Sequence, residues 1–351
     1  MAPFSALPVE LVDGILKELC LFCGPRHYAG CYLEGDGDSL RGCRCLEDDC
    51  RSSGRVATLA SLCLTSRQLN SLATRHLYHY LGCEKKWYLL AATLLARPDL
   101  AQLVMELSVF SSSPVSYSDC PPEVVAYFKD QFQIFSAAMS KAGETANSAL
   151  FEDGDKFSGS YNVPLDILLP LCPNLERLNT ALWYFDAFRF LCPQSLPRLQ
   201  RVSLSHGDTE LGFRFGKITP LFRAAPNITD VYCWSVNGCE HAEPGWLAKI
   251  TSLDCEYSAL GGGDLINIFA ACPNLETLKY EMGGFAVGDD QFTLREVRDS
   301  VLAHAPKLKY LHLDAGEVCD VEEYWEEDEV EGLRHTLAER GIHLDLQMRF
   351  D

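Results

Sequence analysis

The feature that most constrains the fold of this chain is a short corner of sequence that recurs through its C-terminal half. In its fullest form the corner reads Pro-Asn-Leu-Glu-Arg-Leu at 173–178 and Pro-Asn-Leu-Glu-Thr-Leu at 273–278. Variants of it begin at Pro197, Pro226, Lys249, Pro306 and Gly341. The first apolar residues of successive corners, from Leu175 to Ile342, lie 24, 29, 22, 25, 33 and 34 residues apart. Recurrence at such spacings indicates stacked structural repeats.

Each unit has the pattern of a helix, a corner and a strand. The stretch 264–272 has a helical apolar pattern and ends at a proline, which cannot continue a helix. Apolar residues after the corner then predict a short strand, as at Leu308, Leu311 and Leu313. Units of this kind bury their leucines by stacking, with the strands in a parallel inner sheet and the helices outside. The pattern therefore predicts an irregular leucine-rich-repeat-like α/β solenoid, and an ordinary α/β sheet remains the alternative.

Two hydrophobic segments near the N-terminus, 7–19 and 59–72, form a second signal. Each has leucines or isoleucines at helical spacing, and the second is followed by the aromatic stretch 77–81. Pro8 suits the first turn of a helix, where its missing N–H would be unpaired in any case. Such short helices cannot bury their apolar faces alone, so we expect them to pack together or onto a partner.

The order of these segments resembles the F-box, a three-helix module that docks substrate receptors onto the Skp-type adaptor of cullin–RING ubiquitin ligases. The matching residues are Leu-Pro-x-Glu-Leu-x-x-x-Ile-Leu-x-x-Leu from Leu7, then Cys-Leu-Thr-Ser-Arg-x-Leu from Cys63, then Leu77-Tyr78-His79. The Leu-Tyr-His ending is most similar to the fungal form. The resemblance covers about residues 4–82 apart from an insert at about 20–56. A generic helical hairpin that caps a larger domain is the alternative.

The resemblance also implies which residues face the adaptor or form the core of the module. These are Leu7, Pro8, Leu11, Ile15, Leu16, Leu62, Leu64 and Leu69. It further implies that the chain is the substrate-recognition subunit of an SCF-type ligase, with an unknown protein as its target. A non-catalytic repeat scaffold with no ubiquitin role, or a zinc-stapled interaction module, are the alternatives.

Six of the 16 cysteines lie in the insert, which has too few large apolar residues to form a core. A structural zinc ion would hold it, because Cys20 and Cys23 have the spacing of a zinc knuckle. Cys43 and Cys45 would complete the tetrahedron. Cys50, Cys31 and His27 are the possible substitutes. Reduced thiols on a flexible loop are the alternative.

These signals divide the chain into an F-box module at 4–82 and a solenoid at 83–351. A first, diverged repeat is expected at 87–107. A helical insertion is expected at about 111–161, where Val125, Phe128 and similar residues mark an amphipathic helix after two prolines.

The formal net charge of −19 argues against nucleic acid as a partner, because an acidic surface repels a phosphate backbone. Part of the excess lies in an acidic run at 317–331, which we interpret as a solvated loop leading into a helix. A docking site for a basic partner is the alternative.

The longest apolar run, 88–96, is too short to span a membrane, and no basic region precedes the first helix. We therefore expect a soluble protein of the cytoplasm, the nucleus or both.

The sequence offers little support for catalysis. It contains no Gly-x-Ser-x-Gly, no phosphate-binding loop with its lysine and no His-Glu-x-x-His. The three glycines at 261–263 are better explained by a tight turn into a helix than by phosphate binding. We therefore expect a binding protein and not an enzyme.

Overall fold

The structure is a computed structural model, and it describes part of the chain. The described residues are 7–23, 49–83, 86–110, 120–141, 163–183, 187–188, 191–207, 211–239, 247–283, 292–314 and 327–347. Side chains are not described at 49–53, 132, 135–136 and 138–141.

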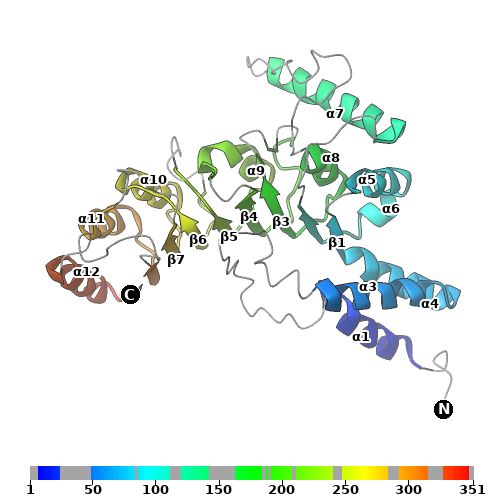
Figure 1. Cartoon of the computed structure of the whole chain (residues 1–351), viewed down its shortest axis with the longest axis horizontal. Helices are drawn as coiled ribbons and strands as arrows, with labels where there is room; N and C mark the ends of the chain where they lie inside the picture. Colours follow the sequence, from blue (N-terminus) through cyan, green and yellow to red (C-terminus); the bar gives the residue numbers. More distant parts are fainter. Residues whose placement is uncertain are drawn as a thin grey trace.

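The described chain combines helices and strands (Figure 1). A helix precedes most strands, although none is described between residues 182 and 201 or between 234 and 252. The strands are β1 (Tyr80–Cys83), β2 (Glu106–Val109), β3 (Arg177–Leu182), β4 (Arg201–His206), β5 (Asp230–Trp234), β6 (Ser252–Ser258), β7 (Thr277–Met282), β8 (Tyr310–Asp314) and β9 (His343–Gln347). The helices are α1 (Val9–Leu19), α3 (Asp49–Cys63), α4 (Arg67–His79), α5 (Trp87–Ala96), α6 (Pro98–Ala101), α7 (Pro122–Lys141), α8 (Val163–Leu171), the 3-10 helix η5 (Phe215–Ile218), α9 (Thr219–Ala224), α10 (Gly262–Ala271), α11 (Leu294–His304) and α12 (Glu327–Glu339).

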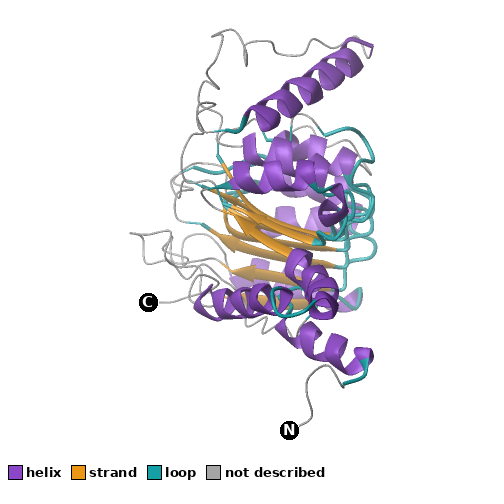
Figure 2. Ribbon diagram, turned by 90° about the vertical axis from the view of Figure 1, so that its right-hand side faces the viewer, coloured by secondary structure: helices purple, strands orange, loops and turns teal. Residues whose placement is uncertain are grey.

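The nine strands form one parallel sheet in which every strand pairs with its neighbours in the sequence, from β1 to β9. The strands make a single twisted layer, with helices packed against it (Figure 2). The prediction of an α/β fold with a parallel sheet is therefore confirmed. Each of the seven corners found in the sequence leads into one of the strands from β3 to β9.

The corners bind each repeat to the one before it. The asparagine of the corner donates a side-chain hydrogen bond to a backbone carbonyl of the preceding unit, over 2.8 Å from Asn174 to Gln102 and 2.6 Å from Asn274 to Ala248. The following leucine, such as Leu175 or Leu275, is completely buried. A corner thus satisfies one polar group and fills the core at the same point.

Burial alternates along the strands, because successive side chains of a strand point to opposite faces. In β3, for example, Leu178, Thr180 and Leu182 are buried, while Arg177 and Asn179 are half-buried on the opposite face. The buried side chains join one continuous core that extends from Trp87 to Ile342. We call the opposite, half-buried side the open face of the sheet.

The three helices α1, α3 and α4 form a separate helical module at the β1 end of the sheet (Figure 1). Among the described side chains, its own buried core is small and consists of Val12, Leu16, Leu59 and Ala73. The second hydrophobic segment differs from the single helix that its pattern suggests. It is broken after α3, because the Ser66 hydroxyl accepts a hydrogen bond from the N–H of Leu69 and caps a new helix.

The first strand of the sheet is not predicted by the sequence pattern. α4 includes Leu77-Tyr78-His79 and ends at His79, and β1 begins at the next residue, within the aromatic stretch 77–81. β1 lacks the Pro-Asn-Leu corner of the later units, so no local pattern distinguished it. The module and the sheet are therefore joined with no connecting loop.

Two other predicted segments are partly described. Helix α7 follows the two prolines as expected, with Phe128 and Val124 buried in the main core. Of the acidic run, residues 317–326 lie outside the described residues, and Glu327 begins α12. No helix in the described part of the chain combines the length and the apolar character needed to cross a membrane.

Candidate functional site

The helical module places the eight residues implied by the F-box resemblance in three different environments. Leu7, Leu62 and Leu69 are half-buried against the module core. Pro8, Leu11, Ile15 and Leu64 are exposed. Leu16 is completely buried. The structure thus separates the residues that hold the module together from those that are available to a partner.

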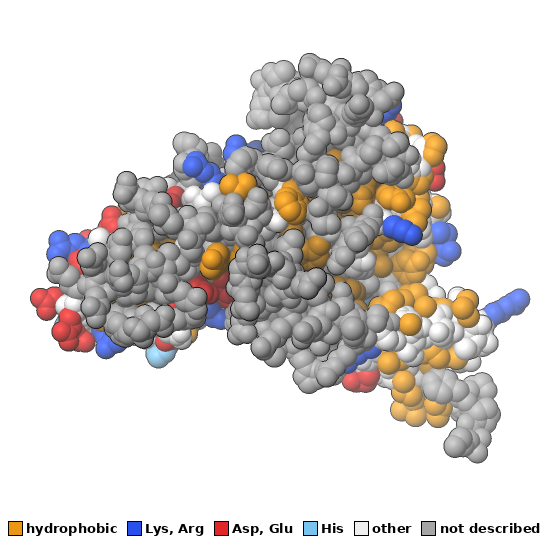
Figure 3. Space-filling view, in the orientation of Figure 1, with side chains coloured by type: hydrophobic (Ala, Val, Ile, Leu, Met, Phe, Trp, Pro, Cys, Tyr) orange, Lys and Arg blue, Asp and Glu red, His pale blue; other side chains and the backbone are white. Residues whose placement is uncertain are grey.

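Among the described residues, the exposed large apolar side chains are concentrated on this module. Leu64 is 88% exposed and Leu11 is 56% exposed. Five of the ten large apolar side chains that are exposed among the described residues belong to α1, α3 and the turn after α3, namely Val9, Leu11, Ile15, Val56 and Leu64. Hydrophobic side chains are accordingly visible over this part of the molecule in Figure 3. A concentration of exposed apolar groups is typical of an interaction surface.

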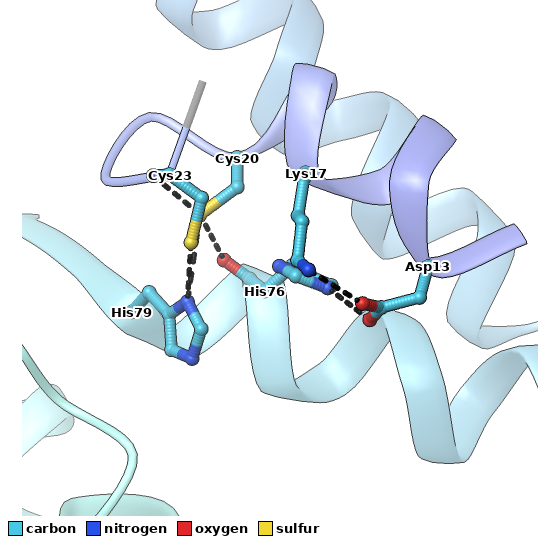
Figure 4. A network of polar contacts seen from close by, with 6 residues as sticks. All are labelled: Asp13, Lys17, Cys20, Cys23, His76 and His79. Carbon is cyan, nitrogen blue, oxygen red and sulfur yellow. Dashed lines mark hydrogen bonds and ion pairs between the residues drawn. The ribbon is translucent and has the colours of Figure 1, made fainter. Parts of the chain in front are cut away.

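A second feature of the module is a cluster of two cysteines and two histidines, which we call the Cys–His cluster (Figure 4). Cys20 follows the last residue of α1 and Cys23 comes three residues later, while His76 and His79 lie in the last turn of α4. One potential ligand atom from each of the four lies within 4.8 Å of all the others. His79 Nδ1 is 3.2 Å from the Cys23 Sγ and 3.6 Å from the Cys20 Sγ.

The geometry around His76 leaves one ring nitrogen available. Its Nε2 lies 2.9 Å from the Asp13 Oδ1, and Asp13 is also paired with Lys17 over 3.1 Å. Its Nδ1 is buried and has no hydrogen-bond partner among the described residues. A histidine that is oriented by a carboxylate through one nitrogen and presents the other is the usual arrangement at a protein metal site.

The same contacts separate the pKa values of the two thiols. Burial raises the pKa of Cys20, but the adjacent imidazoles of His76 and His79 and the N–H of Cys23 stabilise the thiolate more, so that the pKa is lowered. Burial raises the pKa of Cys23, and the charge on Cys20 raises it further. Without a cation the cluster thus favours a single thiolate, because two adjacent thiolates repel each other. A divalent cation would stabilise both.

The Cys–His cluster is connected to the sheet by packing as well as by the chain. The ring of Phe22 packs edge-to-face on the imidazole of His79, with centroids 5.9 Å apart. The guanidinium of Arg177 in β3 lies over the same phenylalanine, 4.6 Å from its centroid, and pairs with Glu106 of β2 over 3.5 Å. The carbonyl of His79 accepts a hydrogen bond from the N–H of Met105, just before β2.

The structure brings together only part of the ligand set expected from the sequence. Cys20 and Cys23 lie in the Cys–His cluster. Cys31, Cys43, Cys45 and His27 lie outside the described residues, as does the side chain of Cys50. The two histidines of the cluster do not belong to the ligand set that the cysteine pattern predicts.

A signal for the two histidines was nevertheless present. His76-x-x-His79 has the same spacing as Cys20-x-x-Cys23, and residues three apart lie on one face of a helix. In the F-box resemblance this stretch corresponds only to the aromatic end of the module. The 52 residues between Cys23 and His76 exceed the usual distance between the two halves of a local zinc motif.

The open face of the sheet carries polar and aromatic side chains joined across neighbouring strands. Tyr232 donates to Glu256 over 2.7 Å, and Lys279 pairs with Asp254 over 3.5 Å. Asp345 accepts hydrogen bonds from Tyr310 and His312. Burial raises the pKa of Glu256 to about 7. This face therefore offers specific polar groups to a partner.

Comparison with known proteins gives little further information. No protein-family model matches the chain, and no curated protein is similar to it at a significant level. Among solved structures, internalin C2 from Listeria monocytogenes aligns with 12% identity and a TM-score of 0.28. That alignment covers 61% of this chain and 92% of the internalin chain. A likeness this slight supports no conclusion about fold or function.

Proposed function

We propose that the chain is the substrate-recognition subunit of an SCF-type cullin–RING ubiquitin ligase. In this proposal α1, α3 and α4 form an F-box that binds the Skp-type adaptor. The leucine-rich-repeat-like sheet binds a target protein. The chain carries out no chemistry itself, because a separate subunit transfers ubiquitin. Its contribution is to hold the target near the ligase at high effective concentration.

The observation that carries the proposal is the exposure of apolar residues within the F-box-like series. Leu11 and Ile15, four residues apart on α1, are both exposed, while Leu16 of the same helix is buried. One side of α1 thus supports the module, and another presents leucine and isoleucine to solvent. Covering such side chains with a partner removes apolar surface from water, which is favourable by about 25 cal/mol per Å².

Target binding is assigned to the open face of the sheet. Its side chains come from successive parallel strands, so that a single ligand can contact several repeats at once. The pairs Tyr232–Glu256 and Lys279–Asp254 supply oriented donors, acceptors and charges. Polar groups arranged in this way give specificity more than affinity.

Adaptor binding tests the proposal with a double substitution at exposed positions. The full-length chain should co-purify with a co-expressed Skp-type adaptor, and Leu11→Ala/Ile15→Ala should weaken binding at least about tenfold, because each truncated anchor costs more than about 1 kcal/mol. Leu302→Ala, at an exposed position of α11, is the matched control and should bind like the native chain. Leu16 is avoided because it is buried and its loss would unfold the module.

Two outcomes would contradict the proposal. One is that the native chain recovers no adaptor, and the other is that the double variant recovers as much as the native chain. If the adaptor does not bind while a partner still associates with the sheet, the chain is a repeat scaffold with no ubiquitin role.

A further inference from the structure

We propose that the Cys–His cluster binds one structural Zn²⁺ ion, which joins the end of α1 to the end of α4 beside the first strand of the sheet. The site differs from the one that the cysteine pattern suggested, because its second pair of ligands comes from α4 and not from the insert. The inference does not depend on the ubiquitin proposal.

The donor atoms fit zinc in both kind and spacing. Two thiolates and two imidazoles form a set that favours tetrahedral Zn²⁺. Zinc bonds of about 2.3 Å to sulfur and about 2.0 Å to nitrogen, at the tetrahedral angle, place the two ligand atoms about 3.5 Å apart. The Nδ1 of His79 lies 3.6 Å and 3.2 Å from the two sulfurs. Small side-chain movements would therefore accommodate the ion.

The second, independent observation is the orphaned nitrogen of His76. Its Nδ1 is buried with no hydrogen-bond partner among the described residues, which is unfavourable unless another group satisfies it. Its Nε2 is held by Asp13 over 2.9 Å, so the tautomer with a free lone pair on Nδ1 is favoured. A bond to a metal ion is the partner that this nitrogen lacks.

A disulfide between Cys20 and Cys23 explains the arrangement less well. It would use both sulfurs but leave the His76 Nδ1 buried and unpaired. Asp13 would then hold the imidazole of His76 in place although that imidazole binds nothing through its other nitrogen. With zinc, two thiolates, two neutral imidazoles and a divalent cation add up to zero net charge, which suits a buried site.

Burial and coordination number make the site structural. Cys20, His76 and His79 are buried, and Cys23 is exposed, so that the metal can reach the site from one side. Four protein ligands leave no open position for a water molecule or substrate. The ion would instead fix the angle between the module and the sheet, because the carbonyl of His79 accepts a hydrogen bond from Met105, just before β2.

Metal analysis of the purified, reduced full-length chain tests the inference. The native chain should carry about one zinc ion per molecule. Cys23→Ser, at the exposed ligand, should lose it, and so should His79→Ala. Cys192→Ser and His335→Ala, at an exposed thiol and an exposed imidazole elsewhere, are the matched controls and should keep the metal.

A double variant, Cys43→Ser/Cys45→Ser, distinguishes this site from one built with the insert, and it should also retain zinc. Replacement by Co²⁺ in the native chain needs no variant to fold. It should produce the strong visible absorption of a tetrahedral ion and charge-transfer bands from two thiolates, not three or four.

Three results would overturn the inference. The first is a native chain that carries no zinc, including one in which Cys20 and Cys23 form a disulfide. The second is loss of zinc from the Cys43→Ser/Cys45→Ser variant while His79→Ala retains it. The third is a cobalt spectrum of three or four thiolates.

Discussion

The Nδ1 of His79 lies 3.2 Å from the Sγ of Cys23, although 56 positions separate the two residues in the sequence. The carbonyl of the same histidine accepts a hydrogen bond from the N–H of Met105, just before β2, and the residue after His79 begins β1. One residue therefore belongs both to the Cys–His cluster and to the sheet. Anything that orders this cluster also orders the junction between the module and the repeats.

Removal of metal should loosen the helical module more than the sheet. Among its described side chains the module has only four buried core residues, so a bound ion would supply much of its stability. An ion at 1,000 times its dissociation constant contributes about 4 kcal/mol. After chelation, amide hydrogen exchange should therefore accelerate in α1 and α4, while β5 to β8 keep their protection. Equal acceleration in both regions, or in neither, would contradict this.

Asp13→Asn should weaken metal binding without removing a ligand. The carboxylate holds the Nε2 of His76, and loss of such a partner typically lowers metal affinity about 10–100-fold. Competition with a zinc chelator would measure the change, and the cobalt spectrum should keep its two-thiolate character. Asp99→Asn, which removes an exposed carboxylate paired with Arg97, is the control. An unchanged affinity would show that Asp13 does not position the ligand.

The asparagine corners should each contribute measurably to the stability of the repeats. Asn274→Ala removes the hydrogen bond to the Ala248 carbonyl and should lower the free energy of unfolding by about 1–2 kcal/mol in urea titrations. Lys307→Ala is the matched control, because Lys307 is exposed at the equivalent position of the next corner. Equal effects of the two substitutions would mean that the corner acts through its leucine alone.

Glu256 should make the stability of the sheet depend on pH. Its pKa in the folded chain is raised by burial to about 7 from the ordinary value of 4.5. The folded state thus binds the proton more tightly, so the stabilisation is complete below pH 4.5 and is lost as the pH rises through about 7. Glu256→Gln should flatten this decline by about 1 kcal/mol, after allowance for partial solvent screening.

Urea titrations of Glu256→Gln at pH 5 and pH 8 would measure that difference. The exposed Glu331→Gln is the control for loss of one negative charge. An unchanged difference between the two pH values would show that Glu256 does not carry the effect.

Local pattern was sufficient to predict the repeats. A corner such as Pro-Asn-Leu at 273–275 contains a helix stop, a side-chain donor and a buried leucine within three residues. These three features can be recognised in the sequence without information about distant parts of the chain. β1 could not be predicted in this way, because it has no corner and becomes a strand by pairing with β2, Tyr80 opposite Glu106. Helix α1 could be predicted only in part. Helical spacing indicated the helix, but it did not distinguish exposed Ile15 from buried Leu16.

By itself, the sequence determined the parallel α/β architecture and the stacking of its repeats. Each repeat contains its own corner and apolar strand pattern within about 30 residues. It also indicated half of the Cys–His cluster, because Cys20 and Cys23 are local neighbours. Only the tertiary structure decided the other half. His76 and His79 reach the cysteines because α4 packs against α1, and that packing depends on apolar contacts between segments far apart in the chain. A long-range contact of this kind leaves no periodic pattern in the sequence, so only the folded chain reveals which pairs of short motifs meet.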